Sequence, residues 1–381
     1  MPTLDKVRAH HELRRKGISL LASENRVSKA VREALGSDLA GRYGEDFYGG
    51  SRIAQEIKAD CEDLARRLYR CKHALVTSTA GNICDLAAIF AYTREGDKVA
   101  MVHRDHGGYP FGWKKFHREH VRIPYDEGTA SVRVDDAKAL LDRERPKLTI
   151  LGSSLILFPY PIRELSFAGK MGGYGFDGSH VLGLIQGGEF QDPLAEGAQF
   201  LIGSTHKSLP GPQGGLVLTN DAAVHEKFKA FAEFEDVPGI GLIDNWHPNR
   251  VAGLAVALEE LQKRGREYAR QVVKNSQALA RALVDEGIGV KYAARGYSKS
   301  HQVLLDLAPE KAEGFSRKLE AVNLFADRMC RLGTQELAWS GMKEAEMQRI
   351  ASWMRQVWDG ETQGVAVRVE ALAKEFLEPP F

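Results

Sequence analysis

The chain has 381 residues, of which 43% are hydrophobic, enough for one large domain and a smaller companion with separate cores. Its 52 Lys and Arg residues nearly balance 51 Asp and Glu residues, and the resulting net charge of +1 creates no field that favours nucleic acid or an anionic membrane. No apolar run approaches the roughly 20 residues that span a bilayer, and the N-terminal segment is charged. We therefore expect a cytoplasmic protein with neither kind of partner.

The cysteines argue against both a metal site and a disulfide framework. Cys61, Cys71, Cys84 and Cys330 lie too far apart in sequence to form a CxxC pair. We expect them to be reduced and mostly buried, and we predict no metal ligands.

Apolar, strand-like runs alternate with helical patterns over the first two thirds of the chain. These runs cover residues 74–76, 98–102, 148–151, 181–185 and 216–218. Alternation of this kind is typical of an α/β fold in which helices cover a mostly parallel sheet.

The pattern becomes helical after Pro248. Apolar residues then recur with helical spacing from Val251 to Leu261, which predicts a long helix joining two domains. A second helical pattern runs from Met347 to Trp358, and residues 302–305 form a strand candidate before it. We predict an N-terminal arm (1–30), a large domain (31–264) and a smaller α+β C-terminal domain (265–381).

Lys207 is the first candidate for chemistry. It follows the apolar run 200–202 and precedes a Gly- and Pro-rich turn, so its ammonium is expected to be partly desolvated. Burial penalises the charged form of an amine and lowers its pKa, which makes the amine nucleophilic enough to form a Schiff base with an aldehyde cofactor. A solvated loop lysine is the alternative explanation of the same pattern.

Asp177 is the second candidate, thirty residues before Lys207. It ends a short strand-like run, and a carboxylate there would keep a pyridine nitrogen protonated so that the ring accepts electrons from a breaking bond. A helix N-cap is the alternative role for this acid. Together with Lys207, it favours pyridoxal phosphate (PLP) as the cofactor.

Several separate motifs occur in one order along the chain, and together they resemble the serine hydroxymethyltransferase family. The resemblance extends from about residue 20 to about residue 358. The motifs are Leu21-Ala22-Ser23-Glu24-Asn25, Arg42-Tyr43-Gly44-Glu45, Tyr48-Gly49-Gly50, His106-Gly107-Gly108, Asp177 with His180, Thr205-His206-Lys207, Gly211-Pro212-Gln213-Gly214-Gly215 and Arg331-Leu332-Gly333-Thr334.

This resemblance implies a fold and a set of cofactor contacts. The fold would be that of PLP-dependent transferases of fold type I, similar to aspartate aminotransferase, with a large mostly parallel domain and a smaller C-terminal one. His106 would stack on the pyridine ring. The implied cofactor-binding residues are Ala80, Gly81 and Asn82 at the phosphate, together with His106, Ser154, Asp177, His180, His206 and Lys207.

The resemblance also implies how a small amino-acid substrate is bound. Arg331 would bind the substrate carboxylate, because a guanidinium group contacts both carboxylate oxygens at once. Glu45 would act as acid and base at the substrate hydroxyl. Ser23, Tyr43 and Tyr48 would line the same pocket. In the family the tyrosine and glutamate motif reaches the active site of the partner subunit, which implies a homodimer with shared active sites.

Four segments depart from the family pattern. Residues 46–47 replace a longer insert, residues 324–330 form a shorter loop, residues 234–241 replace a more glycine-rich segment, and Gln213 stands where an arginine is usual. These changes weaken the prediction of tetrahydrofolate as the cosubstrate and leave the PLP residues almost untouched.

Several functions therefore remain open. The first is serine/glycine hydroxymethyl transfer with a reduced pterin, tetrahydrofolate or an analogue, as the one-carbon carrier. The second is a pterin-independent aldolase or transaldolase that acts on threonine-like β-hydroxy amino acids. An aminotransferase is a third, and it is disfavoured because amino transfer needs no base such as Glu45 at a side-chain hydroxyl. A non-catalytic protein that retains the fold is disfavoured by the intact Lys207, Asp177 and Arg331.

Overall fold

The computed structural model describes residues 1–233 and 239–376, which fall into two compact units. The larger unit comprises Val27–Arg266, and the smaller unit combines Met1–Arg26 with Glu267–Phe381. The residues predicted as a separate arm are therefore divided between the two units, most of them in the smaller one. Of the departing segments, residues 234–238 lie outside the described part of the chain.

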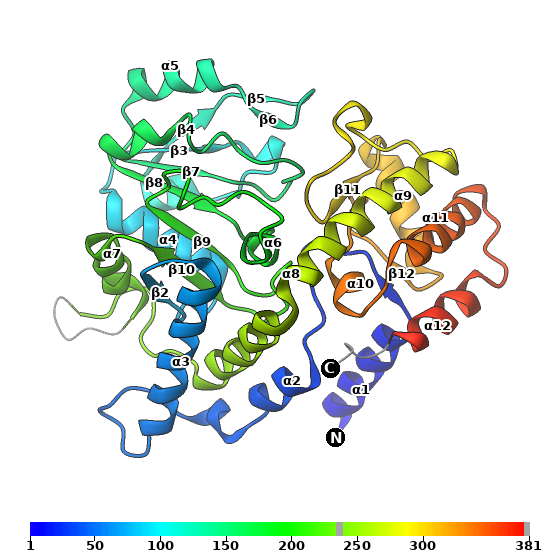
Figure 1. Cartoon of the computed structure of the whole chain (residues 1–381), viewed down its shortest axis with the longest axis horizontal. Coiled ribbons are helices and arrows are strands. Elements are labelled where there is room, and N and C mark those ends of the chain that lie inside the picture. Colours follow the sequence, from blue (N-terminus) through cyan, green and yellow to red (C-terminus); the bar gives the residue numbers. More distant parts are fainter. Residues whose placement is uncertain (234–238, 377–381) are drawn as a thin grey trace. The chain divides into compact units, whose positions relative to one another are not determined.

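The larger unit is built on a seven-stranded sheet with the order β2-β10-β9-β8-β7-β3-β4 (Figure 1). Strands β3, β4, β7, β8 and β9 pair in parallel, and β10 is antiparallel to both of its neighbours. The predicted mostly parallel sheet is thus confirmed. The strands are β2 (His73–Leu75), β3 (Lys98–Val102), β4 (Glu119–Ile123), β7 (Leu148–Leu151), β8 (Gly173–Asp177), β9 (Phe200–Ser204) and β10 (Gly215–Thr219).

Helices cover this sheet because alternate residues of its strands point to opposite faces. Phe200 and Ile202 of β9 share one buried cluster with Ala87 and Ala88 of α4 and with Phe228 of α7. The helices of this unit are α2 (Lys29–Leu35), α3 (Arg52–Tyr69), α4 (Gly81–Tyr92), α5 (Val134–Glu144), α6 (Leu182–Gly187), α7 (Ala222–Ala232) and the first part of α8 (Pro248–Asp285), and a small hairpin is formed by β5 (Tyr125–Asp126) and β6 (Ser131–Val132).

One predicted strand is wrong. The apolar run at residues 181–185 forms most of the helix α6, whose residues are all buried, and the neighbouring strand is β8 instead. A short apolar run that is buried on every side carries no periodicity that separates helix from strand. The long helix after Pro248 is confirmed, since α8 continues for 38 residues and contributes to both units.

The smaller unit has its own hydrophobic core, as expected from the length and hydrophobic content of the chain. Two pairs of short strands, β1 with β12 in parallel and β11 with β13 antiparallel, pack with helices around residues such as Leu279, Leu332 and Met354. Its elements are α1 (Pro2–Arg15), β1 (Ile18–Ser19), the end of α8, β11 (Gln302–Leu304), α9 (Pro309–Glu320), β12 (Leu324–Phe325), β13 (Arg331–Gly333), α10 (Gln335–Trp339), α11 (Glu344–Asp359) and α12 (Val365–Glu375).

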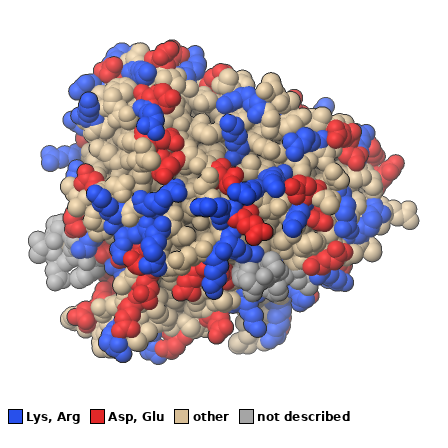
Figure 2. Space-filling view, viewed as in Figure 1, with Lys and Arg blue, Asp and Glu red and all other residues tan. Residues whose placement is uncertain are grey.

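The charges on the surface agree with the nearly equal numbers of basic and acidic residues in the sequence. Basic and acidic side chains are interspersed on the face drawn in Figure 2. All four cysteines are buried and free. Within the described residues, no helix is long and apolar enough to cross a membrane, and no group of three or more His, Cys, Asp or Glu side chains is placed to hold a metal ion.

Candidate active site

Lys207 lies in a closed loop between β9 and β10. The Thr205 N–H donates to Gly214 O at 3.1 Å, the Gly211 N–H donates to Thr205 O at 2.9 Å, and the Thr205 hydroxyl donates to Pro212 O at 2.6 Å. These bonds fix the loop at both ends, and the Lys207 side chain is half-buried. The loop therefore presents this amine from a rigid support, as a covalent site requires.

Asp177 is the last residue of β8, the parallel neighbour of β9. The Ser179 N–H donates to Asp177 Oδ1 at 2.9 Å, and the Ser179 hydroxyl oxygen accepts from the Ser204 N–H at 3.0 Å. The carboxylate is thus oriented by the turn that follows it and is linked to the end of β9. Because the carboxyl ends of parallel strands share one edge of a sheet, Asp177 and the Lys207 loop lie at the same edge, where ligands bind in open α/β sheets.

The first turn of α4 meets this edge at Gly81. A Cβ atom at Gly81 would overlap Ser204 Oγ, so only glycine allows this close approach. Ala80 is the N-cap of this twelve-residue helix and makes no side-chain capping hydrogen bond, and the Ile83 N–H donates to Ala80 O at 3.1 Å. The positive end of the helix dipole at this point favours an anion. The start of α4 is thus compatible with the phosphate site predicted at Ala80, Gly81 and Asn82, which stays a prediction.

We expect the Gly81→Ala variant to bind PLP at least about tenfold more weakly and to lose about 1–3 kcal/mol of stability, because the added methyl group separates α4 from Ser204. PLP titration and thermal unfolding measure both effects. Gly314→Ala in α9 is the matched control: nothing lies within 4 Å of the new Cβ, and alanine favours a helix by up to about 1 kcal/mol. Equal PLP affinity in the Gly81 variant and the native protein would contradict this role.

His106 and Ser154 are brought together by the ends of β3 and β7. Both the N–H and the hydroxyl of Ser154 donate to Gly107 O, at 2.6 and 2.9 Å. The His106 ring stacks on Tyr125 with centroids 4.9 Å apart, and its Nδ1 lies 3.3 Å from Glu127 Oε1. One face of the imidazole therefore packs against an aromatic ring, and the stacking of His106 on a pyridine ring stays a prediction.

The other two predicted histidines differ in their surroundings. His180 is buried, three residues after Asp177. Burial, assisted by the nearby charge of Lys207, lowers the pKa of His206 to about 4, and among the described residues its buried Nδ1 has no hydrogen-bond partner. His206 is consequently a neutral imidazole at neutral pH, with one ring nitrogen available to a bound group.

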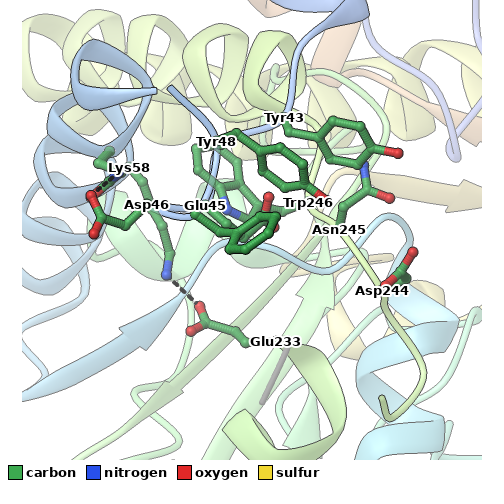
Figure 3. Close-up of a pocket in the computed structure, with 12 residues that line it drawn as sticks. Tyr43, Glu45, Asp46, Tyr48, Lys58, Glu233, Asp244, Asn245 and Trp246 are labelled. Atoms are coloured by element: carbon green, nitrogen blue, oxygen red, sulfur yellow. Dashed lines mark hydrogen bonds and ion pairs between the residues drawn. The ribbon is translucent and has the colours of Figure 1, made fainter. Parts of the chain in front are cut away.

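Glu45 lies in a pocket of about 630 Å³ within the larger unit (Figure 3). Both of its carboxylate oxygens are buried and have no hydrogen-bond partner within the described residues. Tyr43 and Tyr48 stack at 4.4 Å beside it, so three of the predicted substrate residues share one pocket. Neither Lys207 nor Asp177 lines this pocket. Its lining residues are Tyr43, Gly44, Glu45, Asp46, Phe47, Tyr48, Gln55, Lys58, Glu233, Asp244, Asn245 and Trp246.

Ser23 and Arg331 belong to the smaller unit, where they lie on adjoining segments. Leu21 forms a bridge with Leu332, and the Gly333 N–H donates to Leu20 O at 2.7 Å, which places the Ser23 turn beside β13. Arg331 Nε donates to Asp327 Oδ2 at 3.1 Å. This ion pair orients the guanidinium, a contact that the sequence reading did not anticipate.

Two buried charged residues of the larger unit were missed by sequence reasoning. Asp85 is 2% exposed in α4, and Arg250 is 5% exposed at the start of α8. Arg250 donates from Nη2 to Val76 O, and its Nε and Nη1 have no partner among the described residues. A lone acid in the apolar stretch 83–90 was a signal for Asp85, whereas nothing in the sequence around Arg250 distinguishes it from a surface arginine.

A family model described as serine hydroxymethyltransferase matches residues 3–354 of this chain. The chain belongs to the serine hydroxymethyltransferase family. It is 38% identical to a serine hydroxymethyltransferase of Methanopyrus kandleri, over 98% of this chain and 92% of that protein. It is 36% identical to a serine hydroxymethyltransferase of Methanocaldococcus jannaschii, over 96% of this chain and 92% of that protein.

A solved structure of L-threonine transaldolase from Pseudomonas fluorescens, in its internal aldimine state, is similar with a TM-score of 0.91 and 25% identity, covering 98% of this chain and 91% of that one. The family and this neighbour confirm the fold-type I architecture and a PLP-dependent transferase. The residues at the sheet edge fit that cofactor, because a lysine, a carboxylate and an uncapped helix N-terminus are the groups that a pyridoxal ring and its phosphate need.

Proposed function

We propose that this enzyme catalyses hydroxymethyl transfer between serine and glycine, with a reduced pterin as the one-carbon carrier. Family membership supports the reaction class. The observation that carries the proposal within the structure is the placement of Asp177 and the Lys207 loop at the ends of two neighbouring parallel strands. Bound PLP supplies an electron-accepting ring that stabilises the carbanion left when the Cα–Cβ bond of serine breaks.

Four side chains of this protein have separate roles in the proposed reaction. Asp177 would hold the nitrogen of the bound ring protonated, and Lys207 would attach the cofactor covalently. Arg331 would bind the substrate carboxylate and so fix the orientation of the bonds at Cα. Glu45 takes the proton of the serine hydroxyl as formaldehyde leaves, and returns it in the reverse direction.

A homodimer with shared active sites completes this proposal. Glu45 lies in a pocket that Lys207 does not line, and the aromatic residues around it are unusually exposed: Tyr43 by 47%, Phe47 by 89% and Tyr48 by 40%. Exposed aromatic side chains in one cluster are typical of an interface. A second subunit packed on this cluster would receive Glu45 at its own Lys207 loop, and a two-fold axis would repeat the arrangement.

Threonine-type aldol cleavage is the second candidate, favoured by the structural similarity to an L-threonine transaldolase and by the short segments at residues 46–47 and 324–330. Both candidate reactions use Glu45 as the base, because each breaks the Cα–Cβ bond next to a hydroxyl group. An aminotransferase needs no such base, and the absence of any keto acid product would exclude it.

The deciding experiment measures products from serine, threonine, allo-threonine and α-methylserine, each with and without tetrahydrofolate. We expect serine to be converted to glycine, with a rate that increases at least about tenfold when the pterin is added, because the pterin removes the formaldehyde product. A rate of serine turnover that does not change when tetrahydrofolate is added, together with rapid cleavage of threonine, would instead establish the aldolase. Inertness toward all four substrates would contradict both candidates.

A further inference from the structure

Asp85 is a buried acid in the larger unit to which none of the roles above has been given. It lies on α4, one turn after Gly81, in a stretch whose other side chains are apolar or small. Its side chain is 2% exposed, and Oδ1 has no hydrogen-bond partner within the described residues. An ionised carboxylate in such a place is costly, so the protonation state of Asp85 needs a physical account.

The position of α4 brings this acid to the cofactor site. Gly81 packs against Ser204 at the end of β9, and the Ser204 N–H donates to the Ser179 hydroxyl, whose own N–H holds Asp177. Asp85 lies within electrostatic range of both Asp177 and Lys207. The two carboxyl groups therefore belong to one electrostatically coupled cluster at the strand ends.

The titratable groups within electrostatic range of Asp85 come from four parts of the chain. Cys84 lies beside it on α4, Tyr109 lies in the segment after β3, and Asp177 and Lys207 lie at the sheet edge. Burial raises the pKa of Asp85 well above its usual value; the negative charge of Asp177 raises it further, and Lys207 opposes both effects. Burial also raises the pKa of the Cys84 thiol to about 12 and that of the Tyr109 phenol, so both remain neutral near pH 7.

We propose that Asp85 is a positioning residue of the cofactor site, a neutral carboxylic acid that confines the negative charge of the cluster to Asp177 so that the anionic cofactor can bind at the start of the same helix. This inference rests on the proposed PLP site. PLP brings a phosphate dianion to the N-terminus of α4, where the helix dipole favours it. A second carboxylate one turn away would oppose that attraction, and in a poorly solvated site the repulsion is weakly screened.

The first measurement is a difference infrared spectrum between PLP-loaded protein and apoprotein. We expect the carbonyl band of a protonated carboxylic acid that shifts when PLP binds, and we expect Asp85→Asn to remove it. Asp142→Asn, at an exposed acid of α5, is the matched control and should leave the band unchanged. This measurement also works on the unaltered protein, so it decides the protonation state even where a variant folds poorly.

The second measurement is the affinity of the apoprotein for PLP as a function of pH. At neutral pH, Asp85→Asn should bind PLP within about threefold of the native protein, because a neutral amide replaces a neutral acid of the same shape. As pH rises through the range in which the infrared band disappears, the native protein should lose about tenfold more affinity than Asp85→Asn. Alkaline losses due to other groups occur in both proteins and cancel in the ratio.

The role of Asp85 would be overturned by an infrared band that is absent at neutral pH, or by an affinity ratio that stays constant while the band disappears. An affinity for PLP at neutral pH that is at least about tenfold weaker in Asp85→Asn would also overturn it. That result would mean that the negative charge of an ionised Asp85 contributes to PLP binding. Failure of the proposed function is separate, because it would show as no PLP binding to Lys207 in any of these proteins, and the inference about Asp85 would fall with it.

Discussion

Lys207→Ala is expected to lower the rate of serine cleavage by at least about a thousandfold and to remove the visible absorbance of protein-bound PLP. The reason is that the closed loop from Thr205 to Gly214 presents one amine at the sheet edge, and alanine leaves the cofactor without its covalent attachment. Absorbance of the purified variant and a glycine-formation assay measure the two effects.

The matched control is Lys318→Ala, which removes an exposed lysine of α9 in the smaller unit. It should retain both the absorbance and the activity of the native enzyme. A Lys207 variant that kept the absorbance after extensive dialysis against buffer without PLP would show that another lysine holds the cofactor.

Glu45→Gln is expected to lower serine cleavage by roughly a hundredfold, which is the contribution typical of a general acid–base group, while PLP absorbance remains unchanged. The amide keeps the size of the side chain in its pocket and removes the proton acceptor. The sharper readout comes from mixing this variant with Lys207→Ala under conditions that allow subunits to exchange.

Shared sites predict a specific recovery in that mixture. A hybrid dimer has one site that combines the native Lys207 of one subunit with the native Glu45 of the other, and random exchange should restore about one quarter of the native activity. If each subunit used its own Glu45 and Lys207, both sites of every hybrid would be defective. No recovery after confirmed exchange would therefore contradict the shared-site dimer.

The fold and the cofactor class followed from local patterns in the sequence. The strand-like runs at residues 98–102 and 148–151 and the helical spacing after Pro248 have structural counterparts in β3, β7 and α8. The direction of β10 had no such signal, because an apolar run reads the same in a parallel and in an antiparallel strand. The run at 181–185 failed for a related reason, since complete burial of α6 removes the amphipathic period that identifies a helix.

Site residues were harder to predict where they depend on contacts between distant segments. Asp177 stands out because it ends an apolar run and Lys207 because it follows one, and the sheet then brings those two strand ends together. Asp85 had a local signal as the one acid in the apolar stretch 83–90, but its burial, like that of Arg250, depends on how α4 and α8 pack. The Asp327–Arg331 pair is local in sequence, but its geometry depends on the turn before β13. The burial and contacts of these residues can be known only once the packing of the chain is known.

We expect PLP to be bound covalently by Lys207, and reductive trapping tests this attachment. The PLP-loaded enzyme is treated with borohydride, digested with a protease and mapped by mass spectrometry. We expect the phosphopyridoxyl group on the peptide that contains Lys207, with near-complete occupancy and at no other lysine. A label on a different lysine, or no label in protein that retains its visible absorbance, would contradict it.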